Sequence, residues 1–383
     1  MSRTYLPNSK QFKRINEQLR NIAGSLAWEQ DPTTWVGVQK IVERGLAPKY
    51  FPVGSQLVAN HFKYGDIIFD VVAHDYLKSC ENKNAHTMTL LSHDTIPFAS
   101  RFDQPEAFYY TEVLNPGTYC FTLAYDCYDW LKGTYYFTID SYQENVQLAI
   151  TRLSNEGMTS AKVTVHPAGQ SYEILRTNIY SGSKGTNLGT LGVELNHPQR
   201  VYAGSNNYME SNIRQYLNSE GEAGIEWWQQ KTKYDRHPSW FEESDAFAAG
   251  FMQGWDLSFI VGVATVNLPC SSNNQYETPD GTIEPNSKYV LKDKFYLPSQ
   301  MEIFGHHRTT TVDDSKQFPY FEEATNTDRF KYTIGSTSKT GWMTRSSFAD
   351  SACDIQCVNT DGWLTNSSSA RNFAVACTIV GNV

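Results

Sequence analysis

The sequence lacks any long hydrophobic run. Within its 383 residues, no window approaches the roughly 18 consecutive apolar residues that a membrane-spanning helix requires. The opening stretch, MSRTYLPNSKQFKR, also lacks the apolar core of a secretory signal peptide. We therefore expect a protein that is made in the cytoplasm, does not insert into a membrane and is not exported by the general secretory route.

Charge is scarce, and the charge present is mostly negative. Charged residues make up 19% of the chain, and the formal net charge is -9. No patch rich in Lys and Arg offsets the repulsion toward phosphate, so nucleic acid is not an expected partner. Aromatic residues reach 14%, with 23 Tyr and 9 Trp, which is typical of β-rich proteins. This composition favours a neutral or polar ligand.

Common catalytic and metal-binding motifs are missing. The sequence has no GxSxG elbow, no HExxH pair and no phosphate-binding loop. His306 and His307 are adjacent, so in a strand they would point to opposite faces and could not share an ion. The acidic run Glu242 to Asp245 lies where a helix N-terminus would favour negative charge. We therefore predict no enzymatic activity and no cofactor, with calcium as the one metal left open.

The cysteines form no paired CxxC motif. Seven are spread along the chain, and in a protein made in the cytoplasm we expect them to be reduced and mostly buried. Cys353 and Cys357, in CDIQC, could hold copper or perform thiol oxidation, or they could point inward as ordinary small residues. The second interpretation is favoured because no His or acidic ligands are specified nearby.

Hydrophobic periodicity predicts helices first and strands next. A helix over Lys10–Ala27 is predicted by one apolar stripe: Phe12, Ile15, Leu19, Ile22 and Leu26. This helix either associates with another surface or packs on its own domain. A second helix follows Asp31-Pro32 and stops at Gly45. From Val53 the period changes to two, which predicts an antiparallel sandwich or roll with strands at 66–72, 87–91, 119–123, 135–139 and 146–150.

The predicted organisation is α+β, with three parts. N-terminal helices occupy residues 1–50, a β-sandwich-like domain occupies 51–180, and a third domain occupies 181–383 and begins with the glycine-rich, linker-like stretch 182–192. In the third domain, a helix capped at Asn206 or Asn207 would bury Ile213, Tyr216 and Leu217. A helical turn is predicted to begin after Pro298-Ser299.

The C-terminal stretch from Thr340 places polar residues between two apolar strands. Asp361-Gly362 predicts a type I′ hairpin turn, because both central positions of that turn need positive φ. Phe373–Val380 predicts a strand that is packed on both faces. The intervening segments, Asp350–Gln356 and Asn366–Asn372, are rich in Asn, Ser and Asp and predict an exposed surface for a polar ligand, with Trp363 available for stacking.

Four stretches carry a resemblance to known proteins: SNNYMESNIRQYLNSE, YVLKDKFYLPSQMEIFG, TGWMTRSS and VNTDGWLTNSSSARNFAVACTI. They resemble uncharacterised bacterial and prophage proteins whose domain is similar to the formylglycine-generating-enzyme branch of the C-type-lectin fold. The resemblance covers about Tyr202 to Val383. IVERGLAPKYFPVGSQLV and GDIIFDVVAHD resemble an N-terminal region of gut-bacterial prophage versions.

The resemblance implies a C-type-lectin-like C-terminal domain whose last segment contacts a ligand. Phage receptor-binding proteins with this fold use that segment, and in some of them a diversity-generating retroelement varies it. The implied ligand-binding residues are Asp350, Ser351, Asp354, Gln356, Asn359, Trp363, Asn366, Ser367, Ser368, Ser369, Arg371 and Asn372. Gly341-Trp342-Met343 departs from the paired aromatics of the family strand. The catalytic cysteine pair of the enzymes is not matched by the spacing of Cys353 and Cys357, so oxidase activity is not carried over.

The sequence thus predicts a non-enzymatic phage or prophage virion protein that binds a host cell-surface glycan or protein. Its other expected partners are virion proteins and copies of itself, with a trimer favoured. The alternatives are a structural capsid or tail decoration protein and, third, a copper or thiol oxidase. Calcium is left open, because Asp350, Asp354 and Asp361 could bind it without a recognisable loop motif.

Overall fold

A computed structural model describes residues 31–104, 204–221, 249–272, 287–306, 313–348 and 353–381, together with strand backbone between 108 and 178 and a few isolated residues. These residues form a mixed α+β structure, as predicted. The predicted helix over Lys10–Ala27 and the glycine-rich stretch before Gly192 lie outside the described residues. No helix within the described part is long and apolar enough to cross a membrane.

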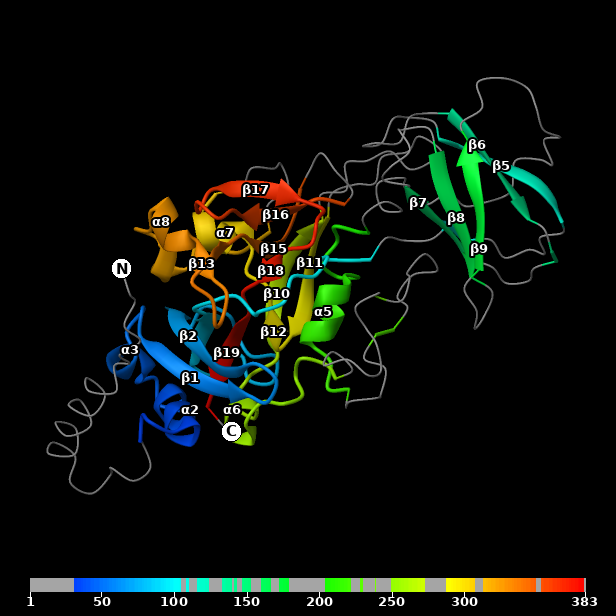
Figure 1. Ribbon diagram of the computed structural model, residues 1–383. Helices are drawn as coiled ribbons and strands as arrows, with labels where there is room; N and C mark the ends of the chain where they lie inside the picture. The colour runs from blue at the N-terminus through cyan, green and yellow to red at the C-terminus, as the bar shows by residue number, and fades with distance from the viewer. Residues whose placement is uncertain are drawn as a thin grey trace, which may run out of the picture.

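The main sheet joins the two ends of the described chain. Its five strands are antiparallel, in the order β1-β2-β3-β19-β12 (Figure 1). Their bounds are Gln56–His61 for β1, Gly65–His74 for β2, Thr87–Ser92 for β3, Phe295–Tyr296 for β12 and Ala376–Val380 for β19. Cys377 in β19 lies opposite Leu90 in β3 and Phe295 in β12. Both faces of β19 are buried from Ala376 to Ile379, as its apolar pattern predicted.

This pairing corrects the predicted domain boundary near residue 180. The sequence pattern assigns strands β1 to β3 to a separate domain, yet they share a sheet with β19. Period-two alternation shows that a strand has a buried face, but it does not identify the strand's partner. The predicted strand Phe373–Val380 is also divided, because Phe373 belongs to β18 (Asn372–Phe373) in a second sheet.

Three short helices pack beside the main sheet: α2 (Trp35–Glu43), α3 (Ala47–Tyr50) and α6 (Leu257–Ile260). Helix α2 is capped by Thr34, whose hydroxyl accepts from Gly37 N at 3.1 Å, so it begins slightly after the predicted Asp31-Pro32. It buries Val38, Ile41 and Val42. The predicted stop is confirmed, since Gly45 follows the helix with a φ of +68°.

Aromatic side chains fill the core under β1 and β2. Trp255 stacks on Phe295 with ring centroids 5.4 Å apart and an interplanar angle of 9°. His61 is buried against them, and both of its ring nitrogens are used. Nε2 lies 3.2 Å from Phe251 O, and Nδ1 accepts from Lys63 N at 3.1 Å. These contacts require the neutral imidazole with its proton on Nε2.

The second sheet has four strands in the order β17-β16-β15-β18. Their bounds are Trp342–Ser347 for β15, Ile355–Val358 for β16, Leu364–Ser367 for β17 and Asn372–Phe373 for β18. Strands β15 and β18 run parallel, and the other pairs run antiparallel. Four short helices accompany the two sheets: α5 (Asn212–Leu217), α7 (Gln300–Phe304), η1 (Pro319–Phe321) and α8 (Asn326–Arg329). Two further antiparallel strand pairs are β10 (Val266–Ser272) with β11 (Ser287–Asp293), and β13 (Lys331–Tyr332) with β14 (Lys339–Thr340).

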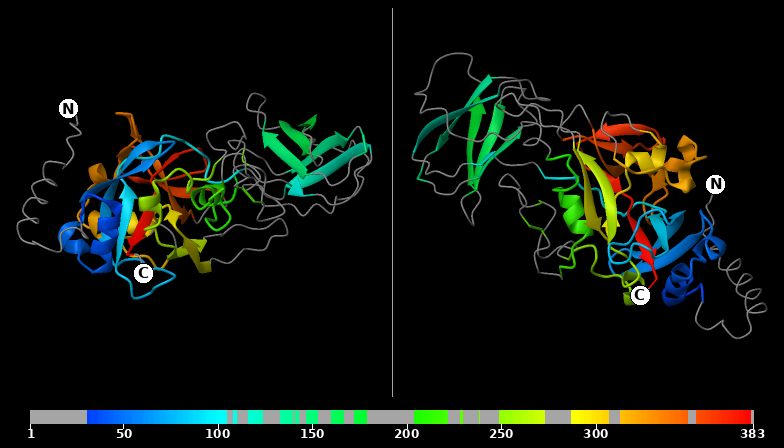
Figure 2. Two further views of the ribbon diagram at one scale, coloured as in Figure 1. Left: turned by 90° about the horizontal axis from the view of Figure 1, so that it is seen from below. Right: turned by 180° about the vertical axis from the view of Figure 1, so that it is seen from behind.

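Six strands between 108 and 178 form two further antiparallel sheets, β4-β7-β8-β9 and β5-β6. They are β4 (Phe108–Tyr109), β5 (Gly117–Leu123), β6 (Gly133–Ile139), β7 (Gln147–Arg152), β8 (Ser160–His166) and β9 (Tyr172–Asn178). Figure 2 shows β5 to β9 as a lobe apart from the main sheet in both views. The strands predicted over 119–123, 135–139 and 146–150 agree with β5, β6 and β7.

Candidate functional site

The predicted C-terminal hairpin is present as β16 and β17. Val358 lies opposite Leu364, and Gln356 lies opposite Asn366. The type of turn differs from the prediction. Among the described residues other than glycine only Asp75 has a positive φ, so Asp361 does not, whereas Gly362 has a φ of +82°. Gly362 N donates to Asn359 O at 2.9 Å, and Asn359 N donates to Trp363 O at 2.8 Å. This pattern is a type I turn followed by a left-handed glycine, within a three-residue loop.

Gly362 also fixes the position of the turn against α8. A Cβ at Gly362 would overlap the backbone oxygen of Asn326. A side chain at this position would therefore have to displace either the turn or the start of α8. The close backbone contact holds Trp363, the next residue, at a defined place on the surface.

Replacing Gly362 with alanine is expected to lower the free energy of unfolding by more than the ~1–3 kcal/mol that a left-handed alanine costs by itself. Gly335→Ala is the matched control, because Gly335 has a φ of +75° and a Cβ there would have no atom within 4 Å. The difference between the two variants in chemical denaturation measures the contact with Asn326. Equal losses at both positions would contradict the docking of the turn on α8.

Trp363 and strand β17 provide the accessible part of the site. The Trp363 side chain is 63% exposed, and its backbone N donates to Asp361 Oδ1 at 3.1 Å. Strand β17 lies at the edge of its sheet, and all four of its residues are half-buried. We name the exposed or half-exposed set the β17 face; it consists of Trp363, Asn366, Ser367, Ser368, Ser369 and Arg371.

Backbone and side-chain contacts hold the far end of the β17 face. Ser367 Oγ accepts from Ser369 N at 3.1 Å and from Arg371 Nε at 3.4 Å. Arg371 N donates to Ser100 O at 2.9 Å, and Ser100 N donates back to Arg371 O at 3.1 Å. Because the loop after β17 is tied both to itself and to residue 100, its polar groups have a fixed arrangement.

Two predicted ligand-binding residues, Asp354 and Gln356, are buried instead of exposed. Asp354 is 6% exposed, and its Oδ2 accepts from Asn366 Nδ2 at 3.1 Å. Gln356 is completely buried, and within the described part of the chain neither of its amide atoms has a hydrogen-bond partner. The prediction of exposure failed because both faces of β16 are buried, from Ile355 to Val358, and Asp354 directly precedes this strand.

Other predicted ligand-binding residues have structural contacts. Asn372 Nδ2 lies 3.1 Å from Thr333 Oγ1 and 3.3 Å from both Thr95 Oγ1 and Ile96 O, so Asn372 joins three segments. Asn359 closes the turn through its backbone. Asp350 and Ser351 lie outside the described residues.

The start of α8 is a neighbour of this surface that the sequence reasoning missed. Thr325 and Asp328 form a capping box, with Thr325 N donating to Asp328 Oδ2 at 2.8 Å. Hydrogen bonds from Thr325 lower the pKa of Asp328, so its carboxylate stays charged at neutral pH. The spacing T-x-x-D was the available signal for this helix start. Asn326 reaches Gly362, so α8 borders the turn that carries Trp363.

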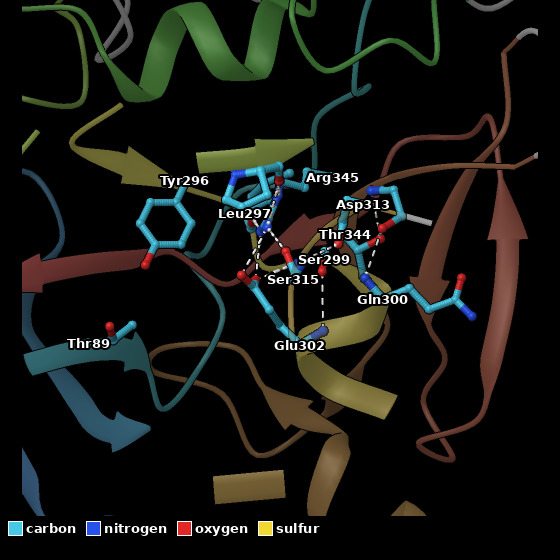
Figure 3. Close-up of polar contacts among 12 residues, drawn as sticks. Thr89, Tyr296, Leu297, Ser299, Gln300, Glu302, Asp313, Ser315, Thr344 and Arg345 are labelled. Carbon is cyan, nitrogen blue, oxygen red and sulfur yellow. Dashed lines mark hydrogen bonds and ion pairs between the residues drawn. The ribbon is translucent and has the colours of Figure 1, made fainter. Parts of the chain in front are cut away.

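A buried ion pair anchors β15 beneath the hairpin (Figure 3). Arg345 Nη1 lies 2.6 Å from Glu302 Oε2, and Arg345 Nη2 lies 2.9 Å from Glu302 Oε1. The two side chains are only 1% and 0% exposed. The remaining guanidinium donors reach Leu297 O, Pro269 O and Ser315 Oγ. Burial alone would lower the pKa of Arg345, but the Glu302 carboxylate outweighs it and raises the pKa above its usual range.

Glu302 of this ion pair also caps the helical turn that was predicted after Pro298-Ser299. Ser299 Oγ accepts from Glu302 N, and Ser299 N donates to Glu302 Oε2 at 2.8 Å, so Glu302 caps α7 while it pairs with Arg345. Figure 3 shows the Gln300 side chain pointing away from Glu302. The arrangement positions β15, α7 and the 313–318 segment, and it serves packing instead of ligand contact.

The cysteines near the site are buried thiols. The five cysteines that the structure describes are free, and Cys353 and Cys357 are both buried. Burial raises the pKa of Cys357 to about 12, so this thiol is protonated at neutral pH. The thiolate is the reactive form of cysteine, and burial disfavours it at Cys357.

Carboxylates and histidines do not gather into a metal site in the described part of the chain, where no group of three His, Cys, Asp or Glu residues could hold an ion. Asp354 and Asp361 lie at opposite ends of β16. His86 and His93 instead pair with single carboxylates, at 3.0 Å from Asp75 and 2.9 Å from Asp70. Glu242, Asp245, Asp350 and His307 lie outside the described residues.

The fold and the β17 face define a mixed α+β protein that presents an exposed tryptophan and polar side chains on an edge hairpin. The chain belongs to the family described as Domain of unknown function (DUF6273), whose model matches residues 170–379. No curated protein and no solved structure matches the chain. The matched range contains β12, the β17 face and nearly all of β19, but not strands β1 to β3, which complete the main sheet.

Proposed function

We propose that this chain is a non-enzymatic protein of a phage or prophage virion that binds a host cell-surface glycan or protein through the β17 face. The observation that carries the proposal is Trp363, which is 63% exposed on a turn that α8 holds in place. An exposed aromatic ring on a fixed backbone loses little conformational entropy when a ligand covers it.

The chemistry of the β17 face fits a neutral polar ligand. The Trp363 ring offers a flat apolar surface for the face of a sugar or an aromatic side chain. Asn366, Ser368 and Ser369 follow it along the hairpin and offer both donors and acceptors, and they are half-buried or exposed. Arg371 adds one positive charge at the far end.

The finer architecture is part of the proposal. A C-type-lectin-like fold for the C-terminal part of the chain is supported by the small four-stranded sheet that carries the C-terminal hairpin. A sandwich-like arrangement between 108 and 178 is supported by the two antiparallel sheets there. In a virion, the chain would contact other virion proteins and copies of itself, with a trimer favoured, and a retroelement would vary the hairpin residues.

Trp363→Ala is expected to weaken binding at least about 30-fold, because a central aromatic contact is worth about 2 kcal/mol or more. Fluorescently labelled protein is tested on a panel of bacterial strains and on a glycan array. Trp363→Phe keeps an aromatic plate and should retain part of the affinity. Tyr142→Ala, which removes an aromatic residue that is 54% exposed elsewhere, should bind as the unchanged chain does.

A double variant that carries both Trp363→Ala and Ser369→Ala gives the contradicting outcome: if it binds as well as the unchanged chain, the ligand contacts a surface other than the β17 face. The alternative of a structural decoration protein makes a different prediction: the free protein would then incorporate into particles but would not block infection. A receptor-binding protein added in excess should compete with the virion and reduce infection.

A further inference from the structure

An apolar surface surrounds the outer edge of β1. Five large hydrophobic residues there are exposed, and they come from α2, from β1 with its turn, and from α6 and its end. We name them the β1 patch: Val36, Val58, Phe62, Leu257 and Val261. Phe62 is 91% exposed and Leu257 is 75% exposed, the two highest values among the exposed large hydrophobic residues that the structure describes.

Direct contacts fix the three segments of the β1 patch relative to one another. Trp35 Nε1 donates to Val58 O at 3.2 Å, and the Trp35 ring lies 4.6 Å from that of Phe259. Asp256 N donates to Asn60 O at 3.2 Å, and Phe62 N donates to Gly254 O at 2.6 Å. Figure 1 shows α2, β1 and α6 close together at one end of the main sheet.

These contacts also occupy part of the outer edge of β1. The outward carbonyls of Val58 and Asn60 and the N–H of Phe62 already have partners. A partner for this surface would therefore contact its side chains, and a helix with an apolar stripe is suited to that. Leu257 and Val261 are four residues apart, so they lie on one side of α6 and its end.

We propose that residues 10–27 of the same chain cover the β1 patch. The sequence of this segment gives one apolar stripe of five residues, Phe12, Ile15, Leu19, Ile22 and Leu26. As a helix, the stripe would extend about 22 Å. The segment precedes α2 directly, and Val36 of the patch is the second residue of that helix.

The length and stability of the segment favour this occupant. Asp31 is held in a turn at the start of α2, where its carbonyl oxygen accepts from Thr34 N at 3.1 Å, so the segment joins the described structure close to Val36. The three residues 28–30 span up to about 10 Å, which lets the stripe return onto its own domain. A helix of this length is marginal in water without a partner for its apolar face. A stripe that covers the patch would remove both apolar surfaces from water.

Val58→Thr in the full chain tests whether the patch is covered. Threonine has the shape of valine but carries a hydroxyl. At a side chain in water the substitution leaves the stability of the fold unchanged, whereas under a cover it lowers the stability because the hydroxyl is buried. We expect Val58→Thr to lower the Tm by several degrees. Val290→Thr is the matched control, a valine that is 61% exposed on β11, and its Tm should equal that of the unchanged chain. Equal Tm values for all three proteins would overturn the proposal.

A double-mutant cycle tests which segment covers the patch. Leu19→Ala and Phe62→Ala should each lower the Tm, and the double variant should lose clearly less than the sum of the two. Glu17→Ala, on the opposite side of the predicted helix, should add to Phe62→Ala without coupling. Additive losses for Leu19 and Phe62 would exclude residues 10–27 as the cover.

Sedimentation equilibrium on the same proteins distinguishes two possible covers of the β1 patch: residues 10–27 of the same chain, or the same segment of a second copy. For a cover within one chain, the coupling between Leu19 and Phe62 is independent of protein concentration. Coupling that appears only where the mass exceeds that of one chain would overturn the proposal in favour of contact between copies.

Discussion

Arg345→Met is expected to lower the free energy of unfolding by about 3–5 kcal/mol, because it leaves the Glu302 carboxylate buried without its partner. Both side chains are almost completely buried, and the guanidinium bridges β15 to α7, Leu297 and Ser315. Chemical denaturation followed by intrinsic fluorescence and by circular dichroism measures the loss. The nine Trp residues give a strong fluorescence signal.

Two controls separate the ion pair from packing and from charge in general. Adding Glu302→Gln to Arg345→Met should recover part of the loss, since no uncompensated charge then remains. Lys288→Met breaks an ion pair whose side chains are 52% and 74% exposed, and it should cost less than about 1 kcal/mol. A loss at Arg345 as small as that at Lys288 would mean that the buried pair contributes no more than a surface pair.

Stability is expected to fall by about 3 kcal/mol as the pH is lowered from 6.5 to 4, through His61 alone. Burial lowers the pKa of His61 from 6.5 to about 4, against a smaller opposing effect of the bond to Phe251 O. The unfolded chain therefore takes up a proton in this pH range that the folded chain excludes. The stabilisation is complete above the unfolded pKa and is lost as the pH falls toward the folded pKa. Protonation would also abolish the bond from Lys63 N to Nδ1.

The difference between two pH profiles isolates His61 from the other titrating groups. His61→Gln removes the titration, so its free energy of unfolding should decline less than that of the unchanged chain between pH 6.5 and 4. His86→Gln, at a histidine whose side chain is 53% exposed, should keep the decline. Parallel profiles for the unchanged chain and His61→Gln would show that the imidazole can be protonated within the fold.

Local elements were predictable where a few neighbouring residues determine them. The helix after Pro298-Ser299 is confirmed because Ser299 and Glu302 provide both halves of a capping box. Ile213, Tyr216 and Leu217 are buried in a short helix, as predicted, although Ser211 caps it instead of Asn206 or Asn207. Strands β2 and β3 contain the predicted ranges 66–72 and 87–91.

Long-range pairing was not predictable from the pattern. Leu90 and Cys377 are partners across the main sheet, and nothing in either strand specifies the other. At the candidate site, the hairpin was predicted correctly, but the exposure of its first strand was not. Asp354 and Gln356 are polar and yet buried, since other parts of the chain cover both faces of the sheet at β16. Hydropathy alone assigns such residues to the surface.

The insertion of β19 between β3 and β12 has a consequence for synthesis on the ribosome. Strands β1 to β3 emerge early, but the sheet that they belong to cannot close until residue 380 has been translated and has left the exit tunnel. Until then β3 and β12 present unpaired edges, which are aggregation-prone surfaces that chaperones bind. A product truncated before Ala376 would keep those edges permanently, so we expect the cell's proteases to remove it while the finished chain escapes.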